Sequence, residues 1–331
     1  MRRRAFITII GAAGAWSLGV RAQQSNRVTR IGYLTTGYLD SPESLAMFDV
    51  FRQGLRDLGY VEGANILVEY RGADGKIERF QSLATELVRL NVDLIVASNT
   101  PAALAAQQAT STIPIVVPVM GDPVGDGLVA SLARPGGNIT GSTFLGPKLV
   151  PKRLALLKEA LPTISRVAGL WHPGAYSERT MSDMMNEAEG AARILGIELQ
   201  LVAVHSPDEF DQAFSTIGAA SPDALLVFPS PMLFTERRRI VDLATAHRLP
   251  SMSMGREFVE LGGLMAYGAS IPDLVRHSVT YVDKIIKGAK PADLPVEQPT
   301  KFDLAINVKT AKQFGIDIPP TLLARADEVI E

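Results

Sequence analysis

Short apolar runs alternate with amphipathic stretches along most of this chain, and this alternation limits the possible folds more than any other feature. The first run covers residues 28–34, and the stretch after it spaces its apolar residues 3, 3, 4 and 3 positions apart, at Leu45, Phe48, Phe51, Leu55 and Leu58. That spacing is the period of one helix face. The run Leu94-Ile95-Val96-Ala97 has no polar alternation, as expected for a parallel strand covered by helices on both faces.

The alternation runs through the chain twice. We predict strands at residues 28–34, 65–70, 93–98, 113–119, 167–171, 199–204, 224–228, 250–254 and 264–267. Helices are expected between them, including one over 101–109 and one over 235–248. Two successive runs predict an α/β fold with two doubly wound parallel-sheet lobes. We take the loop at 134–138 as the break between them, and a single (β/α)8 barrel is the main alternative at this length.

Composition agrees with a globular chain and excludes several kinds of site. The chain has 331 residues, which is longer than a chain that folds around a single hydrophobic core usually is. Its net charge of −2 gives no overall positive field that would attract nucleic acid. It has no cysteine, which excludes thiol nucleophiles, disulfides, iron–sulfur clusters and a lipid anchor on cysteine. Its four histidines are too far apart for a local metal motif, at His172, His205, His247 and His277. We therefore expect no cofactor, no metal site and no nucleic-acid partner.

Residues 1–22 have the pattern of an export signal. An arginine run at residues 2–4 precedes an uncharged apolar run at 5–20, which is too short to span a bilayer. The small or medium-sized side chains of Val20 and Ala22, at positions −3 and −1 of a signal-peptidase site, suit cleavage after Ala22. The Arg3-Arg4 pair resembles a twin-arginine signal, and the general secretory route is the alternative. We expect a soluble periplasmic protein without a lipid anchor.

Motifs for catalysis are missing from the sequence. There is no G-x-x-x-x-G-K-[ST] loop and no G-x-S-x-G elbow, and the glycine-rich stretch at 121–127 lacks the G-x-G-x-x-G order of a dinucleotide site. Asp122 precedes Pro123, which is typical of a helix N-cap followed by proline, although Asp122 could instead contact a ligand. The basic run at residues 237–239 lies in a predicted helix and is interpreted as a solvated face.

A candidate ligand site follows from where the predicted strands end. In open α/β sheets, ligands bind beyond the carboxyl ends of the strands. The residues expected there are rich in hydroxyl and amide groups, which favours hydrogen-bonded capture of a small polar ligand over acid–base catalysis. The candidate binding residues are Thr35, Thr36, Ser98, Asn99, Thr100, Asp122, Thr140, His172, Ser230, Met254 and Tyr267. Backbone amides and hydroxyls near Thr36, Ser98, Thr100 and Thr140 would neutralise an anionic end. Residues of the second lobe, including His172, Ser230 and Tyr267, would close over the ligand.

Five stretches of the sequence carry a family resemblance. They lie at residues 30–34, 54–65, 131–141, 289–302 and 318–328, and they include S-L-A-R-P-G-G-N-I-T-G and A-K-P-A-D-L-P-V-E-Q-P-T-K-F. These long matches resemble the ABC transporter substrate-binding protein family that includes tryptophan/tyrosine-type binders. The resemblance implies a type I periplasmic-binding fold, in which three crossovers join two lobes and the ligand lies in the cleft between them.

On that resemblance, each lobe consists of two separate segments. We expect an N-terminal lobe from residues 28–143 and 269–294, and a C-terminal lobe from residues 146–266 and 297–331. The three-crossover hinge would lie near 142–146, 267–270 and 294–299, beside Gly141, Gly146 and Gly268. A few loop residues there would absorb the change in dihedral angles while both sheets stay rigid.

The leading functional hypothesis is an exported solute-binding component of an ABC importer, and not an enzyme. It would capture a small polar or zwitterionic molecule, such as an amino acid or an aromatic acid, and deliver it to an ABC permease in the inner membrane. We expect it to act as a monomer. Two alternatives remain open: a ligand sensor that docks on a membrane receptor, and a secreted hydrolase that uses Asp122 and His172.

Overall fold

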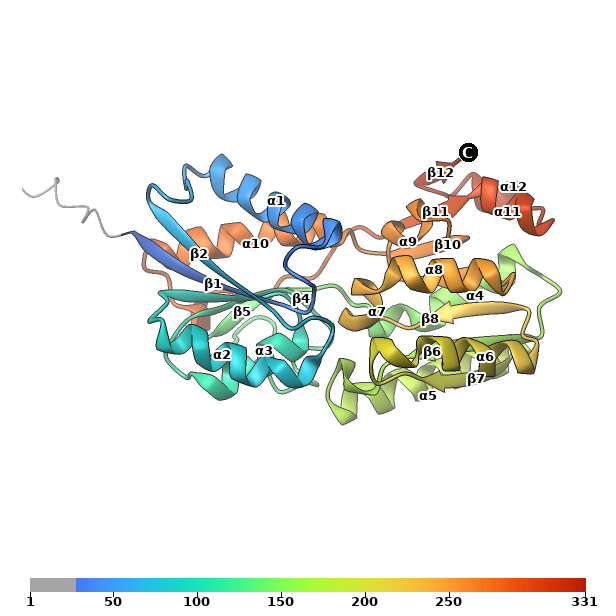
Figure 1. Ribbon diagram of the computed structural model, residues 1–331, viewed down its shortest axis with the longest axis horizontal. Helices are drawn as coiled ribbons and strands as arrows, with labels where there is room; N and C mark the ends of the chain where they lie inside the picture. Colours follow the sequence, from blue (N-terminus) through green and yellow to red (C-terminus); the bar gives the residue numbers. More distant parts are fainter. Residues whose placement is uncertain (1–27) are drawn as a thin grey trace, which may run out of the picture.

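The computed structural model describes residues 28–331, and the export signal expected at residues 1–22 lies outside them. The described chain forms two α/β lobes, each built on its own sheet (Figure 1). The sheet of the N-terminal lobe has five parallel strands in the order β2-β1-β3-β4-β5. These strands are β1 (Thr29–Thr35), β2 (Ile66–Gly72), β3 (Leu94–Ala97), β4 (Ile115–Met120) and β5 (Ile139–Thr143).

Helices cover both faces of this first sheet. Two of them, α1 and α10, pack together on one face, and α2 and α3 pack together on the other (Figure 1). The bounds are α1 (Pro42–Asp57), η1 (Ile77–Arg79), α2 (Phe80–Arg89), α3 (Thr100–Ala109), α10 (Ile271–Ile286) and η5 (Pro291–Asp293). Ser41 and Asn99 cap α1 and α3 with their side-chain oxygens, which satisfies backbone N–H groups that the first turn leaves free. Helix α1 follows β1 and α3 follows β3, so both capped helices begin beyond the carboxyl ends of those strands.

The sheet of the C-terminal lobe has seven strands in the order β12-β11-β10-β9-β8-β6-β7. All of its neighbouring strands run parallel except β10 and β11, which are antiparallel. The strands are β6 (Arg166–Trp171), β7 (Glu198–Ala203), β8 (Ala224–Val227), β9 (Ser251–Ser253), β10 (Met265–Gly268), β11 (Asp303–Asn307) and β12 (Glu328–Ile330).

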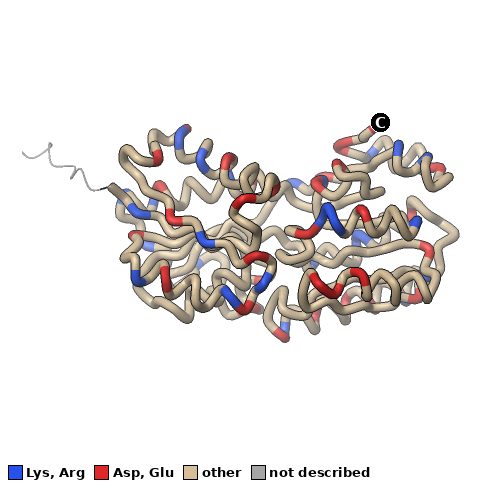
Figure 2. The backbone as a smooth tube through the Cα atoms, in the orientation of Figure 1, with Lys and Arg blue, Asp and Glu red and all other residues tan. Residues whose placement is uncertain are grey.

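Helices also cover this second sheet on both faces. Helices α4 and α5 pack together on one face, and α6 and α8 on the other (Figure 1). The bounds are η2 (Pro147–Leu149), α4 (Val150–Ala160), η3 (Pro173–Ala175), α5 (Glu178–Ile194), η4 (Pro207–Glu209), α6 (Phe210–Ala220), α7 (Pro231–Thr235), α8 (Arg237–Ala246), α9 (Arg256–Glu260), α11 (Val308–Phe314) and α12 (Pro320–Leu323). Basic and acidic residues are interspersed over both lobes (Figure 2). Within residues 28–331, no helix is both long and apolar enough to cross a membrane.

The predicted fold class is confirmed, with differences at particular elements. The loop at 134–138 does not separate the sheets, because β5 follows it and completes the first sheet. The sequence of β5, I-T-G-S-T, contains only one large apolar residue, so apolar periodicity did not predict it. The helix predicted over 235–248 is interrupted at Glu236, which ends α7 and precedes α8.

The chain crosses between the sheets three times. It leaves β5 for α4, returns from β10 to α10, and leaves η5 for β11. Close backbone packing marks two of these crossings. A Cβ atom on Gly268 would collide with the carbonyl oxygen of Met254, and one on Gly141 would collide with the backbone of Val117. Gly141 also has φ +138, which residues with a side chain rarely adopt.

Arg153 ties two of the crossings together from α4. Its side chain is fully buried. Nε donates to the carbonyl of Tyr267 at 2.8 Å, and Nη1 donates to the carbonyl of Gly146 at 2.9 Å. Burial lowers the pKa of Arg153 to about 10, so the guanidinium remains charged at neutral pH. Because backbone carbonyls rather than a carboxylate receive this buried charge, the geometry of the two crossings fixes its position.

Gly141→Ala tests the packing at the first crossing. We expect a loss of about 2–4 kcal/mol in the free energy of unfolding, because the new methyl group meets both a backbone clash and a strained φ. Gly190→Ala is the matched control, since Gly190 lies inside α5, where an added methyl group would meet no atom within 4 Å outside its own helix. The free energy of unfolding of Gly190→Ala should rise by up to about 1 kcal/mol, because alanine has a higher helix propensity than glycine. Urea unfolding measures both, and equal effects would contradict the packing argument.

Candidate functional site

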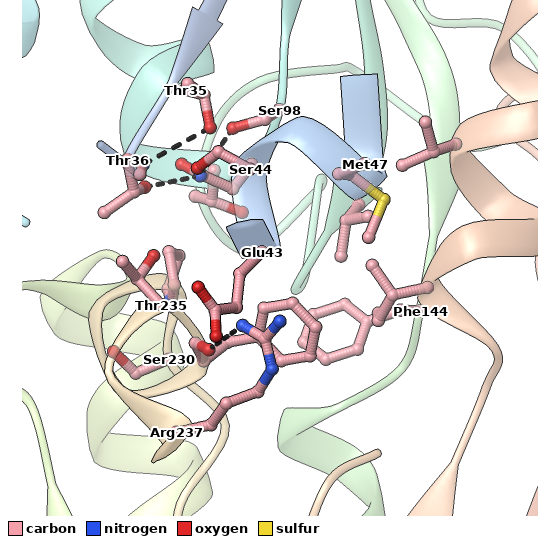
Figure 3. Close-up of a pocket in the computed structure, with 18 of the residues that line it drawn as sticks. Thr35, Thr36, Glu43, Ser44, Met47, Ser98, Phe144, Ser230, Thr235 and Arg237 are labelled. Carbon is pink, nitrogen blue, oxygen red and sulfur yellow. Dashed lines mark hydrogen bonds between the residues drawn. The ribbon is translucent and has the colours of Figure 1, made fainter. Parts of the chain in front are cut away.

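A cavity lies between the lobes, at the carboxyl ends of strands from both sheets (Figure 3). Its volume is about 100 Å³, against the roughly 10–15 Å³ that one water molecule needs. The lining residues are Tyr33, Thr35, Thr36, Gly37, Glu43, Ser44, Met47, Phe48, Ser98, Asn99, Thr100, Val119, Phe144, Tyr176, Ser230, Pro231, Phe234, Thr235, Arg237, Met254, Ile271 and Val275. The cavity is therefore several times larger than one water molecule needs, and residues of both lobes line it.

Hydroxyl groups of the N-terminal lobe form one polar end of the cavity (Figure 3). Asn99 lies among them, and its Nδ2 donates to Thr36 Oγ1 and to Ser98 Oγ, each at 2.8 Å. Its Oδ1 accepts from the backbone N–H of Ala102 at 3.1 Å, which fixes the orientation of the amide. Because Asn99 donates to both hydroxyl oxygens, the hydroxyl protons of Thr36 and Ser98 are left to be donated elsewhere. A carboxylate is the ligand group that such an arrangement suits.

Thr100 and Thr35 also line this end of the cavity, but their hydroxyl oxygens accept hydrogen bonds from the protein backbone. Thr100 Oγ1 accepts from the backbone N–H of Gly121 at 3.0 Å. Thr35 Oγ1 accepts from the backbone N–H of Gly37 at 3.4 Å. These contacts position the loops after β4 and β1, so the two hydroxyls hold the wall of the cavity as well as line it.

Two charged side chains reach the cavity from opposite lobes. Glu43, in the first turn of α1, is the one carboxylate among its described lining residues, and Arg237, at the start of α8, is the one cation. The two side chains extend toward each other in Figure 3. Glu43 Oε1 accepts from Arg238 Nε at 3.2 Å, an ion pair that links the lobes. Burial opposes ionisation of Glu43, but hydrogen bonds from its own backbone N–H and from Arg238 outweigh it and lower the pKa of the carboxyl.

Arg237 is held against the wall of the cavity. Its guanidinium lies 4.7 Å from the centre of the Phe234 ring, and its Nη1 donates to the Phe234 carbonyl at 2.8 Å. Burial lowers the pKa of Arg237. The basic run at 237–239 is thus only partly the solvated face expected, because Arg237 is 8% exposed while the side chain of Arg238 is 64% exposed.

The rest of the cavity wall is apolar and largely aromatic. Tyr33 packs edge-on against Phe48, with ring centres 5.4 Å apart. Phe144 and Tyr176 add rings from the first crossing and from the segment before α5. Flat rings surrounded by aliphatic side chains offer a large apolar contact area to an aromatic ligand.

A second contact joins the lobes on the side of Tyr176. Asp126 Oδ1 accepts from the backbone N–H of Ser177, the N-cap of α5, at 3.0 Å. Ser177 Oγ donates to the carbonyl of Gly125 at 3.4 Å. Gly121 lies so close to the Tyr176 ring that a Cβ atom would collide with it. Together with the Glu43–Arg238 pair, these contacts show that the lobes meet around the cavity.

The structure brings most of the predicted residues to the cavity. Those that line it are Thr35, Thr36, Ser98, Asn99, Thr100, Ser230 and Met254. Four predicted residues, namely Asp122, Thr140, His172 and Tyr267, are absent from the lining and bond within the protein instead.

Each of these four has a specific structural partner. Asp122 Oδ1 accepts from Gly125 N at 2.9 Å and closes a turn, and no helix follows it. The hydroxyl of Thr140 donates to the carbonyl of Leu294 at 2.7 Å, which ties β5 to the third crossing. His172 lies behind Ser230, with Nδ1 3.1 Å from Ser230 Oγ. Tyr267 packs beside Phe302, and its carbonyl accepts from Arg153.

Sequence reasoning missed the two charged residues and the aromatic wall. Glu43 follows Ser41-Pro42, a recognisable helix start, and an acidic residue in that first turn could have been considered as a site residue. Nothing in the sequence pattern distinguished Arg237 from Arg238 and Arg239. Phe144 and Tyr176 lie in irregular segments, where periodicity gives no orientation.

The comparisons with known proteins agree with this geometry. A family model described as ABC transporter substrate binding protein matches residues 36–330. The chain belongs to this family. The match confirms the resemblance, and it identifies a substrate-binding protein rather than an enzyme. The two-lobed architecture is accordingly the type I periplasmic-binding fold.

Three relatives illustrate the similarity. The chain is 27% identical over 263 residues to a tyrosine-binding protein of Clostridioides difficile (strain R20291), covering 79% of this chain and 74% of that protein. It is 26% identical to the ABC domain from Streptococcus pneumonia in complex with L-Trp, with a TM-score of 0.82, covering 92% of this chain and 100% of that one. The leucine-binding protein LivK of Thermotoga maritima MSB8 shares the fold, with 16% identity, a TM-score of 0.52, and coverage of 80% and 78%.

Buried His172 should make the stability of the protein depend on pH. Burial lowers the pKa of His172 from 6.5 to about 4. The unfolded chain therefore binds the proton first, and the stability that the neutral ring contributes is present above pH 6.5 and lost as pH falls to 4. The full loss is about 3 kcal/mol. Urea unfolding between pH 7 and pH 4 should show a steeper decline for wild type than for His172→Asn, and parallel curves would contradict this assignment.

Proposed function

We propose that this chain is the exported solute-binding component of an ABC importer, and that its ligand is an aromatic L-amino acid. The observation that carries the proposal is the composition of the cavity. It combines a cluster of hydroxyl donors, one carboxylate and an aromatic wall. Those three features complement the carboxylate, the ammonium group and the ring of such a ligand.

The ligand carboxylate would bind at the hydroxyl end. Thr36 and Ser98 have hydroxyl protons to donate, because Asn99 already donates to their oxygens. Ser98 and Asn99 lie at the N-terminus of α3, a ten-residue helix whose dipole favours a negative charge there. Charge-assisted hydrogen bonds of this kind are roughly twice as strong as neutral ones.

The ligand ammonium would bind Glu43. This carboxylate is ionised at neutral pH, since its pKa is lowered against the effect of burial by its own backbone N–H and by Arg238. It lies next in sequence to Ser44, which lines the hydroxyl end. An α-amino acid carries its two charged groups on one carbon, so it needs a negative partner near the hydroxyl donors. Glu43 meets that need.

The ring of the ligand would pack among the aromatic residues of the wall. Phe48, Phe144 and Tyr176 supply the apolar area, and such contacts prefer offset or edge-on geometry with a ligand ring. Two relatives support this class of ligand, because one is a tyrosine-binding protein and another was solved in complex with L-Trp.

Delivery to an inner-membrane permease and a monomeric state complete the proposal. The family supports a permease partner. The two lobes would close about the crossings near residues 142–146, 267–270 and 294–299. A ligand that touches both lobes favours the closed form, because it binds that form more tightly than the open one.

Glu43→Gln tests the ligand class. Isothermal titration of wild type should detect L-tryptophan and L-tyrosine, and should detect 3-indolepropionate, which lacks the ammonium group, more weakly. Glu43→Gln should weaken binding of the amino acids by roughly tenfold, since a charge-assisted bond is lost, and leave the indole acid nearly unchanged.

Arg238→Gln is the matched control for that experiment. It breaks the same ion pair between the lobes but keeps the Glu43 carboxylate, so any effect through closure should weaken all three ligands to the same extent. No binding of either amino acid to wild type, or an equal loss for all ligands in Glu43→Gln, would overturn the proposed ligand class.

The export signal gives a separate prediction. Intact-mass measurement of the periplasmic protein should show a mature chain that begins at Gln23. Replacing Arg3 and Arg4 by lysine should block export if the twin-arginine route is used, and unchanged export would assign the general secretory route. A full-length chain retained in the cytosol would contradict the importer role.

A further inference from the structure

Ser230 lines the cavity from the C-terminal lobe, and His172 lies directly behind it. The Ser230 side chain is 1% exposed. Its Oγ accepts from the backbone N–H of Leu233 at 3.4 Å, as the N-cap of α7. The same oxygen lies 3.1 Å from Nδ1 of His172. Whether Ser230 can donate a proton to a ligand therefore depends on which imidazole nitrogen of His172 carries the hydrogen.

The two tautomers give Ser230 opposite roles. With hydrogen on Nδ1, the ring donates to Ser230 Oγ, both lone pairs of the hydroxyl are used, and its own proton is free for the cavity. With hydrogen on Nε2, the serine proton goes to Nδ1, and Ser230 presents no donor to a ligand. One tautomer makes Ser230 a donor and the other makes it an acceptor at most.

Burial and local contacts favour the first tautomer. His172 is 3% exposed, so the neutral ring with a single proton is the preferred form at neutral pH. Nδ1 has an oxygen in reach, whereas no hydrogen bond to Nε2 is made within residues 28–331. Nε2 lies against Gly174, where an added Cβ would be 3.3 Å away. A proton on Nδ1 therefore has an acceptor among the described residues, and a proton on Nε2 has none.

We propose that His172 is a positioning residue that carries its proton on Nδ1 and thereby makes Ser230 a hydrogen-bond donor to the ligand. Asn99 does the same in the other lobe, where its Nδ2 donates to the oxygens of Thr36 and Ser98. Each lobe thus places a donor nitrogen behind the hydroxyls that face the cavity. The ligand class this selects is one with a group rich in acceptors, and its identification as an amino acid rests on the proposed function.

The tautomer can be measured without any ligand. The chain has four histidines, so a long-range ¹H–¹⁵N spectrum of the folded protein labelled with ¹⁵N-histidine is simple, and the signals missing in His172→Asn assign His172. At pH 7 we expect a protonated Nδ1 and an unprotonated Nε2. A protonated Nε2 would overturn the proposal, whether or not an amino acid binds.

Binding measurements test the action of His172 through Ser230. The probes are L-tryptophan and L-tyrosine. We expect Ser230→Ala and His172→Leu each to weaken binding by roughly 3- to 12-fold, with the double variant no weaker than Ser230→Ala alone, because both remove one interaction. His172→Asn should stay within about threefold of wild type, since its side-chain amide can donate from a similar place.

The variants also separate this proposal from a role in packing alone. If the losses in Ser230→Ala and His172→Leu multiply in the double variant, His172 does not act through Ser230, and the proposal fails. If His172→Asn binds as weakly as His172→Leu, donation from this position is not what matters, which also overturns it. If wild type binds neither amino acid, the proposed ligand is wrong, and the nitrogen spectrum alone decides the tautomer.

Discussion

The cavity between the lobes depends on one geometric constraint: the carboxyl ends of two sets of parallel strands face each other across the three crossings. Thr35 and Thr36 lie at the end of β1, and Ser98 and Asn99 follow β3. Ser230 lies beyond the end of β8 in the other lobe. Parallel strands bring all such segments to one edge of a sheet, so residues far apart in the sequence converge on the same space. Helices that start there add their first-turn side chains, as α1 does with Glu43.

The hinge combines close packing with a buried charge. Gly141 and Gly268 leave no room for a Cβ atom, so two crossings lie against backbone of neighbouring segments. Arg153 then donates to the Gly146 and Tyr267 carbonyls, and no carboxylate of the described residues 28–331 pairs with it. A buried guanidinium is costly unless its hydrogen bonds are well formed. The same interactions that hold the crossings together therefore also restrict how they can move.

The sequence predicts strand ends well and side-chain direction poorly. Ser98 and Asn99 follow a fully apolar run, which identified both the strand and the edge where it stops. Thr140 and Tyr267 also lie on strands, but the third crossing covers the former and Arg153 and Phe302 hold the latter. Whether a strand end faces the cavity depends on the path of the three crossings, and the local sequence pattern does not predict that path. Arg237 reaches the cavity because Phe234 holds it there, and nothing in the basic run indicates that contact.

The late position of α10 in the chain has a consequence for synthesis. This helix covers the same face of the first sheet as α1, and Val279 packs close to Gly54. When the first five strands have been synthesised, this face of the sheet is therefore covered by α1 alone and still lacks α10. The second lobe is also incomplete at that stage, since β11 begins at Asp303. Neither lobe can finish its core before α10 and β11 have been made, and a chain truncated before α10 lacks Ile271 and Val275 from the cavity wall.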